Sequence, residues 1–182
     1  MILLFEGLDK VGKSTLIRNF QDLSQMPVFK NPVKPDKFSI FSHGFVNGTY
    51  FGAYLAAKLS GRDMIFDRSH ITEIAYAKVK RGYDPEEDYW LDWEEKNKHY
   101  VVVVYITAPL DTIKQRFKDD KEEYVVDEDI DAINTKYNEY LDPKRSPLSI
   151  IFIDGSLDRQ RMLSQLVIQL QNLGFWSAVR NR

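Results

Sequence analysis

One stretch near the start of the chain decides the fold: Gly7-Leu8-Asp9-Lys10-Val11-Gly12-Lys13-Ser14. It satisfies the pattern G-x-x-x-x-G-K-[ST], in which glycines let the backbone wrap closely around phosphate oxygens. An apolar run over residues 2–5 comes before it, and apolar residues at helical spacing come after it. A strand, a glycine turn and a helix N-terminus form the context that a phosphate-binding loop needs. The stretch therefore predicts an α/β protein that binds phosphate groups.

Outward from this loop, apolar runs that suit buried strands alternate with segments of helical periodicity. The expected strands are 2–5, 28–29, 64–66, 100–106 and 149–153. The expected helices are 13–25, 50–60, 70–81, 85–98, 109–118, 127–141 and 157–172. The glycines and prolines of residues 30–49 indicate a long irregular or partly helical connection. Because strands alternate with helices along the chain, we expect a parallel sheet with right-handed crossovers.

Length and composition narrow the class of protein. The chain has 182 residues, which suits a single domain over residues 1–182. Its 25 basic and 27 acidic residues give a net charge of −2, which argues against wide nucleic-acid contact. There are no cysteines, so disulfides, thiol nucleophiles and cysteine metal sites are excluded. No apolar run has the length of a membrane span, and we expect a cytoplasmic protein.

Ligands of parallel α/β sheets bind at the carboxyl ends of the strands. The residues expected there are Gly7 to Ser14, Asn31, Asp67-Arg68, Thr107 and Asp154. Most of these positions carry polar or charged groups that suit phosphate chemistry. Lys13 can reach the β- and γ-phosphates of a nucleotide, and the Ser14 hydroxyl can bind Mg²⁺. The base-reading motif N-K-x-D of GTPases is absent, so a small-molecule kinase is favoured.

Four segments resemble a known family. The segment Phe5-Glu6-Gly7-Leu8-Asp9-Lys10-Val11-Gly12-Lys13-Ser14-Thr15 resembles the loop F-E-G-x-D-x-x-G-K-[ST]-T of thymidylate kinases. Asp67-Arg68-Ser69, followed by Ala75-Tyr76, is similar to the D-R-[YHS] element of thymidylate and deoxynucleoside kinases. Residues 111–140 are similar to the helix, lid and helix of the family, and Ile153-Asp154 to its closing strand. The resemblance extends in order over almost the whole chain.

The resemblance implies a three-layer P-loop kinase fold, with a five-stranded parallel sheet, helices on both faces and a lid at about residues 117–126. It implies that ATP and Mg²⁺ are used to phosphorylate a deoxynucleoside or its monophosphate in nucleotide biosynthesis. The ATP-binding residues would be Gly7, Leu8, Asp9, Lys10, Val11, Gly12, Lys13, Ser14 and Thr15. Ser14 would bind Mg²⁺, with Asp67 behind it.

The resemblance also implies roles around the acceptor. Asp9 would approach the deoxyribose 3′-hydroxyl, and Arg68 would bridge the acceptor oxygen and the transferred phosphoryl group. Apart from the resemblance, Tyr50, Phe51, Tyr54 and Tyr76 could supply a stacking wall for the acceptor base, with Tyr54 and Tyr76 as the candidate acceptor-binding residues. Catalysis of phosphoryl transfer is mostly positioning plus positive charge, so Lys13, Arg68, Asp67 and Arg116 are the expected catalytic residues. Of the lid cations Arg116, Lys118 and Lys121, Arg116 best suits bidentate contact with phosphate.

Departures from the family fall on the acceptor side. Thymidylate kinases carry R-E-P-G-G-T after the second strand, and deoxynucleoside kinases carry E-P-V there with a basic Glu. This chain has Lys30-Asn31-Pro32-Val33-Lys34-Pro35. Asn31 cannot accept a proton from a 5′-hydroxyl, whereas a monophosphate needs no base. Lys30, Lys34 or Lys37 could replace the charge of the missing Arg.

The first interpretation is thus a kinase of a deoxynucleoside monophosphate, with dTMP or a related pyrimidine nucleotide as acceptor. Three alternatives stay open: a deoxynucleoside kinase, a kinase acting on a polynucleotide base or end, and a nucleotide-binding regulatory module. The partner would be a small nucleotide rather than a membrane or nucleic acid. By analogy with the family, a homodimer would form through the helices 50–60 and 70–81.

Overall fold

The computed structural model describes residues 1–31, 40–83, 85–120 and 127–175. Within them one five-stranded sheet is formed by β1 (Ile2–Glu6), β2 (Val28–Lys30), β3 (Met64–Asp67), β4 (Val101–Thr107) and β5 (Ser149–Asp154). All neighbouring strands are parallel, in the order β2-β3-β1-β4-β5. The predicted α/β class and parallel sheet are confirmed.

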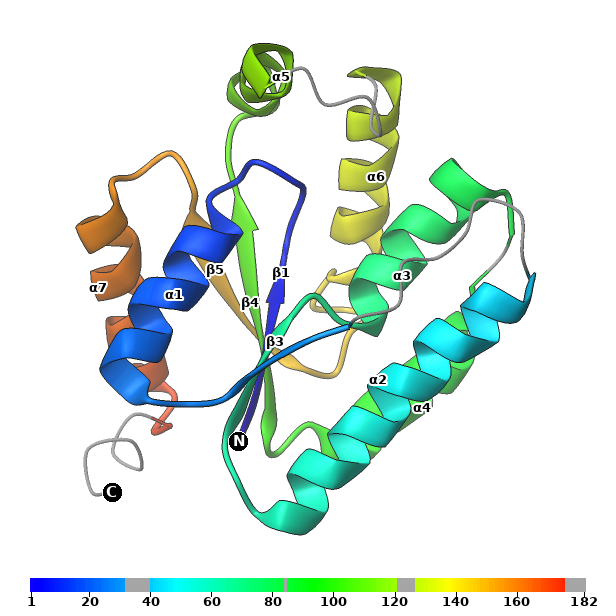
Figure 1. Cartoon of the computed structure of the whole chain (residues 1–182), viewed down its shortest axis with the longest axis vertical. Helices are drawn as coiled ribbons and strands as arrows, with labels where there is room; N and C mark the ends of the chain where they lie inside the picture. Colours follow the sequence, from blue (N-terminus) through cyan, green and yellow to red (C-terminus); the bar gives the residue numbers. More distant parts are fainter. Residues whose placement is uncertain (32–39, 84, 121–126, 176–182) are drawn as a thin grey trace.

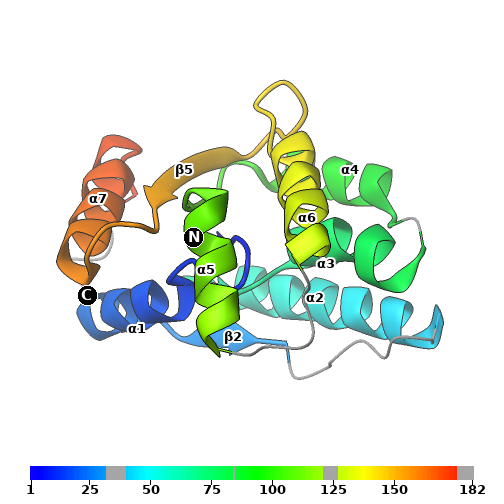
Figure 2. The same cartoon turned by 90° about the horizontal axis from the view of Figure 1, so that it is seen from above.

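Helices cover both faces of this sheet. They are α1 (Lys13–Ser24), α2 (Ile40–Ser60), α3 (His70–Tyr76), the π-helical turn η1 (Ala77–Arg81), α4 (Glu87–Asn97), α5 (Leu110–Asp120), α6 (Asp127–Tyr140) and α7 (Arg159–Asn172). α1 and α7 lie side by side on one face, and α2, α3, α4 and α6 gather on the other (Figure 1, Figure 2). α5 stands beyond the carboxyl end of β4 (Figure 1). Among the described helices, none combines the length and the apolar character needed to cross a bilayer.

The burial of each strand follows its place in the sheet. β1 lies at the centre and is buried at every position, and β4 is buried along six of its seven residues. Continuous apolar runs suit strands that helices cover on both faces. The edge strand β5 instead has alternate exposed positions. Its outward backbone groups are bound by α7, since Gln169 Nε2 donates to Phe152 O at 2.9 Å and Asp154 N donates to Gln165 Oε1 at 3.2 Å.

The predicted start of the second helix is wrong. A helix was expected over residues 50–60, but α2 begins ten residues earlier and spans Ile40–Ser60. Its early glycines look like turn signals, yet a Cβ added at Gly44 or Gly48 would meet no other atom within 4 Å. Val46, Tyr50, Tyr54 and Ala57 form a buried stripe at helical spacing. Burial of this stripe outweighs the low helix propensity of the glycines.

A buried polar cluster joins the helices on the α2–α4 face. His70 Nε2 lies 2.9 Å from Glu94 Oε1, and neither side chain is exposed to solvent. Tyr54 OH lies 3.0 Å from His70 Nδ1, and Tyr140 OH donates to Glu94 Oε1 at 3.0 Å. The His70 ring also stacks on Trp90, with centroids 4.2 Å apart. These contacts anchor the start of α3, directly after the Asp67-Arg68 turn.

Candidate phosphate-binding site

Glycine is required at two points of the loop between β1 and α1. Gly7 has a φ of +138°, and a Cβ there would lie 2.2 Å from the carbonyl oxygen of Ile106. Gly12, directly before α1, has a φ of +96°. Side chains are strained at such angles, whereas glycine is not. The loop can therefore close tightly against the end of β4.

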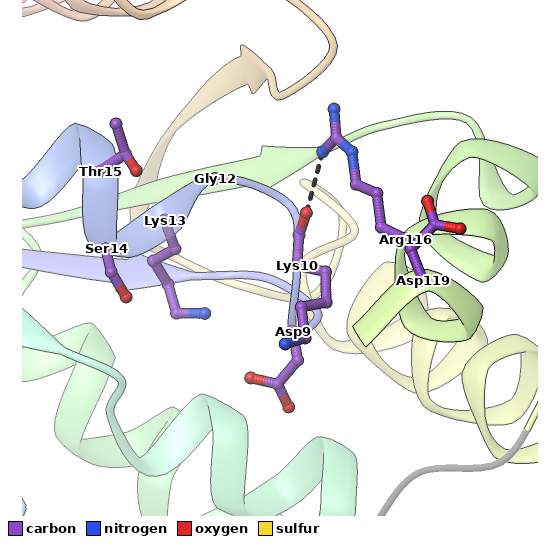
Figure 3. Close-up of a pocket in the computed structure, with 8 residues that line it drawn as sticks. All are labelled: Asp9, Lys10, Gly12, Lys13, Ser14, Thr15, Arg116 and Asp119. Carbon is purple, nitrogen blue, oxygen red and sulfur yellow. Dashed lines mark hydrogen bonds between the residues drawn. The ribbon is translucent and has the colours of Figure 1, made fainter. Parts of the chain in front are cut away.

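A cavity of about 510 Å³ lies over this loop (Figure 3). Its lining residues are Asp9, Lys10, Gly12, Lys13, Ser14, Thr15, Arg116 and Asp119. Three of the residues predicted to bind ATP are not among the lining residues: Gly7, which has no side chain, and Leu8 and Val11, whose side chains are buried in the core. These two residues can contribute only backbone groups. The structure thus brings the predicted loop residues and Arg116 to one cavity, while their contact with ATP stays a prediction.

Lys13 is a buried cation. Its amine lies 3.3 Å from Gly7 O and 3.5 Å from Leu8 O. Burial lowers the pKa of Lys13, and the positive charge of Arg68 lowers it further. Nearby carboxylates oppose these effects, and the resulting pKa is about 8. A bound anion would stabilise the charged amine, so this position is suited to phosphate.

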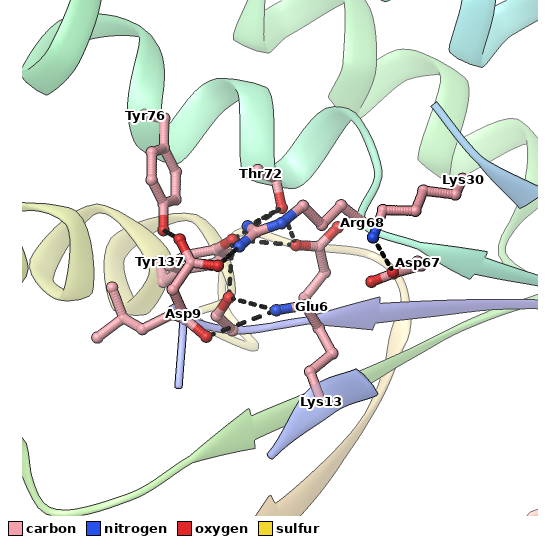
Figure 4. A network of polar contacts seen from close by, with 11 residues as sticks. Glu6, Asp9, Lys13, Lys30, Asp67, Arg68, Thr72, Tyr76 and Tyr137 are labelled. Carbon is pink, nitrogen blue, oxygen red and sulfur yellow. Dashed lines mark hydrogen bonds and ion pairs between the residues drawn. The ribbon is translucent and has the colours of Figure 1, made fainter. Parts of the chain in front are cut away.

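Arg68 lies beside Asp9 at the turn after β3. Its φ is +73°, a left-handed conformation that costs a non-glycine residue roughly 1 kcal/mol. The guanidinium forms an ion pair with Asp9, donates to Thr72 Oγ1 at 3.4 Å and lies 5.4 Å from the ring centroid of Tyr76 (Figure 4). Tyr76 OH donates to Asp9 Oδ2 at 3.1 Å. The sequence prediction that Asp9, Arg68 and Tyr76 share one site is consistent with this geometry.

The charges of this cluster shift one another. Burial raises the pKa of Asp9, but the charges of Arg68 and Lys13 outweigh it and hold that pKa below its usual value. Burial lowers the pKa of Arg68, whereas the neighbouring Tyr76 and Asp9 raise it well above the ordinary range. Both groups stay charged at neutral pH. The site therefore combines a fixed cation with a carboxylate that can accept a hydroxyl.

Glu6 lies beneath Arg68 at the end of β1 and has no exposed surface. Among the described residues, three hydroxyls donate to its carboxylate: that of Ser69, and those of Thr72 at 2.5 Å and Tyr137 at 3.1 Å, the last two of which Figure 4 shows. Glu6 belongs to the F-E-G segment, but sequence reasoning assigned it no role. The ring of Tyr137 is buried as well. The spacing of the sequence alone did not indicate that β1, α3 and α6 meet at these hydroxyls.

The end of β2 carries the acceptor-side departures. Lys30 pairs with Asp67 across neighbouring strands, and its amine lies 3.2 Å from Asp67 Oδ2. Asn31 Nδ2 donates to Val46 O of α2 at 3.4 Å. The amide of Asn31 thus has a structural contact. Lys34 and Lys37 lie outside the described residues.

Arg116 does not point at open space above the loop. Its guanidinium donates to Lys10 O at 2.8 Å (Figure 3) and to Gly155 O at 3.3 Å. Arg116 thereby joins the phosphate-binding loop to the loop after β5. Arg116 directly precedes the predicted lid of residues 117–126. Residues 121–126, including Lys121, fall outside the described residues.

Tyr54 is placed apart from the other predicted acceptor residues. It is 2% exposed, stacks on Trp93 with centroids 4.6 Å apart, and its hydroxyl contacts His70. The side chain is part of the aromatic core between α2 and α4. Its burial argues against the predicted contact with an acceptor base. Apolar aromatic residues at helical spacing are more often core than site, and Tyr54 follows that rule.

The strand order, the glycine loop between β1 and α1, and the buried lysine at the start of α1 define the class. This is the P-loop kinase fold, as the sequence resemblance implied. No protein-family model matches the chain, and no curated protein sequence matches it. The similarity to known proteins is therefore found in solved structures.

Three solved nucleotide-binding proteins share the fold over nearly their whole length. The YorR protein of Bacillus subtilis, in complex with phosphorylated GDP, is 25% identical, with a TM-score of 0.72 over 96% of this chain and 97% of that chain. Deoxyadenosine kinase from M. mycoides is 20% identical, with a TM-score of 0.69 over 94% and 100%. Thymidylate kinase from Candida albicans is 18% identical, with a TM-score of 0.70 over 96% and 92%. At these identities the likeness to the two kinases establishes the fold alone.

Proposed function

We propose that this protein is an ATP- and Mg²⁺-dependent nucleotide kinase, which transfers the γ-phosphoryl group of ATP to a deoxynucleoside monophosphate. The first candidate acceptor is dTMP or a related pyrimidine nucleotide. The convergence of Lys13, Asp9 and Arg68 at the carboxyl ends of adjacent strands carries the proposal. The shared fold with a thymidylate kinase and a deoxyadenosine kinase supports it.

The roles of the residues follow from their positions. Lys13 holds the β- and γ-phosphates, and Arg68 stabilises the charge that spreads over the transferred phosphoryl group. Asp9 accepts a sugar hydroxyl, while Tyr76 holds the carboxylate of Asp9 in place. Arg116 orders the ATP side of the cavity by fixing the carbonyls of Lys10 and Gly155.

The residues present also fit Mg²⁺. Ser14 lines the cavity, and Asp67 ends the strand next to β1. The described residues contain no cluster of three or more His, Cys, Asp or Glu side chains around one point. Mg²⁺ in kinases is held by few protein groups, together with water and phosphates, so Ser14 and Asp67 would suffice. When bound, it would neutralise phosphate charge.

The acceptor side favours a monophosphate. A nucleoside needs a base for its 5′-hydroxyl, but Asn31 stands where such a base is expected and its amide contacts Val46 O. An ionised monophosphate needs no base, and the exposed amine of Lys30 offers it a positive charge. The second candidate is a deoxynucleoside kinase with Asp67 as the base, since this carboxylate lies at the neighbouring strand end.

A substrate panel tests the proposal. γ-labelled ATP and Mg²⁺ are incubated with the protein and a series of nucleosides and monophosphates, and the products are separated by chromatography. Labelled diphosphate from dTMP or another monophosphate is the expected result. Labelled monophosphate from a nucleoside would replace the first candidate by the second. ATP binding without transfer to any acceptor would favour a regulatory module or a polynucleotide acceptor.

We further propose a cytoplasmic homodimer, in which α2 forms the larger part of the interface. Phe51, Leu55 and Leu59 are 41%, 46% and 77% exposed and follow one another at four-residue spacing. α3 contributes less than expected, because most of its side chains are buried within the monomer. Sedimentation velocity at micromolar concentration is expected to give a dimer, and Leu59→Glu to shift it to monomer. A monomeric wild type would contradict this assembly.

A further inference from the structure

We propose that Glu6 is a positioning residue of the phosphoryl-transfer site and acts through Arg68. The inference rests on the proposed kinase function, in which Arg68 contacts the transferred group. Glu6 itself is fully buried behind Arg68 and touches no surface that a substrate could reach.

The first step is that Arg68 needs support. Its backbone is held in a left-handed conformation at the strand-to-helix turn, which an arginine does not adopt without surrounding contacts. The next residue, Ser69, is the N-cap of α3, and its hydroxyl accepts from Ile71 N at 3.1 Å. The same hydroxyl donates to Glu6. Glu6 therefore fixes the residue that immediately follows the strained one.

The second step concerns the guanidinium. Thr72 Oγ1 accepts from Arg68 Nη1 at 3.4 Å and donates to Glu6 Oε2 at 2.5 Å. A hydroxyl has one proton to donate, and Thr72 donates it to the carboxylate of Glu6. Its oxygen lone pair is therefore directed at Arg68. The negative charge of Glu6 also raises the pKa of Arg68 and acts on Lys13 in the same direction. Glu6 thus orients one side of the fork while Asp9 holds the other.

The third step links the site to α6. Tyr137 OH donates to Glu6 Oε2 at 3.1 Å and lies 2.9 Å from Thr72 Oγ1. β1, α3 and α6 therefore meet at one carboxylate (Figure 4). Glu6 directly precedes Gly7, the first residue of the phosphate-binding loop. Its hydrogen bonds to Ser69 and Thr72 therefore connect this loop to the segment that carries Arg68. A residue at this junction sets the distance between the two cations that act on one phosphoryl group.

Glu6→Gln is the main test, because glutamine keeps the shape but loses the charge and cannot accept from all three hydroxyls. We expect kcat to fall by about 10- to 100-fold, as small misplacements of catalytic groups do, with KM for ATP changed less than about threefold. Circular dichroism and urea unfolding check that the variant is folded. Unchanged kcat in a folded Glu6→Gln protein would overturn the inference.

A double-mutant cycle separates positioning from a general structural role. If Glu6 acts through Arg68, Glu6→Gln lowers kcat by less than about twofold when Arg68 is already Ala. Equal factors in both backgrounds would overturn the inference while leaving the kinase function intact. Absence of phosphoryl transfer by the wild type would remove the proposed function itself, and this inference with it.

A matched pair of tyrosines keeps the test valid if Glu6→Gln does not fold. Tyr137→Phe removes a hydroxyl that donates to Glu6, and we expect about a 3- to 10-fold loss of kcat, the cost of about one hydrogen bond. Tyr105 lies beside it, with ring centroids 5.5 Å apart, but its hydroxyl donates to Asn138 Oδ1 at 3.4 Å. Tyr105→Phe is expected to keep wild-type kcat. Equal effects of the two substitutions would contradict the role of Glu6.

Discussion

At the scale of single residues, Lys13 and Arg68 show how burial prepares a site for an anion. Lys13 is buried, Arg68 is partly buried, and the positive charge of Arg68 lowers the pKa of Lys13. The carboxylates of Asp9 and Glu6 raise the pKa of both cations and so favour their charged forms. Among the described residues, the hydrogen bonds of the lysine amine go to the carbonyls of Gly7 and Leu8 and not to these carboxylates. In the proposed function, binding of phosphate would need little reorganisation, because burial has already removed water from around Lys13.

The lowered pKa of Lys13 predicts a specific dependence of stability on pH. In the folded chain this pKa is about 8, against an ordinary value of 10.5. Between these values the unfolded chain holds a proton that the folded chain has released, so the free energy of unfolding rises with pH in this window. Below about pH 8 both states are protonated and the penalty of burial is fully present.

Urea unfolding of wild type and Lys13→Met between pH 7 and pH 10 measures this effect. The free energy of unfolding of the wild type should rise relative to that of the variant as the pH passes 8. Other titrating groups are common to both proteins and cancel in the difference. A difference that stays constant across the range would show that Lys13 titrates normally.

For Arg68, the expected loss lies mainly in the transition state. Arg68→Ala should lower kcat by at least as large a factor as it raises KM for the acceptor, because the planar donor fork binds the phosphoryl group most strongly as charge spreads over its oxygens. Steady-state kinetics with saturating ATP separates the two constants. An effect on KM alone would make Arg68 a binding residue.

At the scale of elements, two glycines differ in whether their surroundings leave room for a side chain. Gly7 cannot carry a side chain, because a Cβ would lie 2.2 Å from Ile106 O at a φ of +138°. Gly48 lies within α2, and a Cβ there would meet nothing within 4 Å. We expect Gly7→Ala to destabilise the fold and abolish ATP binding, whereas Gly48→Ala raises the free energy of unfolding by about 0.5–1 kcal/mol.

Urea unfolding of the two alanine variants, each against wild type, checks this contrast. Because both substitutions add the same methyl group, the difference between them reports the surroundings alone. A Gly7→Ala protein that binds ATP with wild-type affinity would mean that the loop relaxes more easily than its geometry indicates. A destabilised Gly48→Ala protein would contradict the expectation that this position of α2 has room for a methyl group.

At the scale of the whole molecule, the sequence predicted the sheet better than the site. Continuous apolar runs predicted β1 and β4, and the glycine loop predicted the part of the chain over which the cavity lies. The start of α2 was missed because exposed glycines resemble turn signals until the buried stripe of the helix is seen. Glu6 and Tyr137 were missed because they are 131 residues apart and meet only in the folded chain.

A competition assay tests the central claim most directly. Equal amounts of dTMP and thymidine are offered together with γ-labelled ATP and Mg²⁺, with Lys13→Ala as the folded control. A nucleotide kinase of the proposed kind produces labelled dTDP, and the control loses this activity by several orders of magnitude. Labelled dTMP as the main product, or equal transfer by the Lys13→Ala protein, would contradict the proposed function.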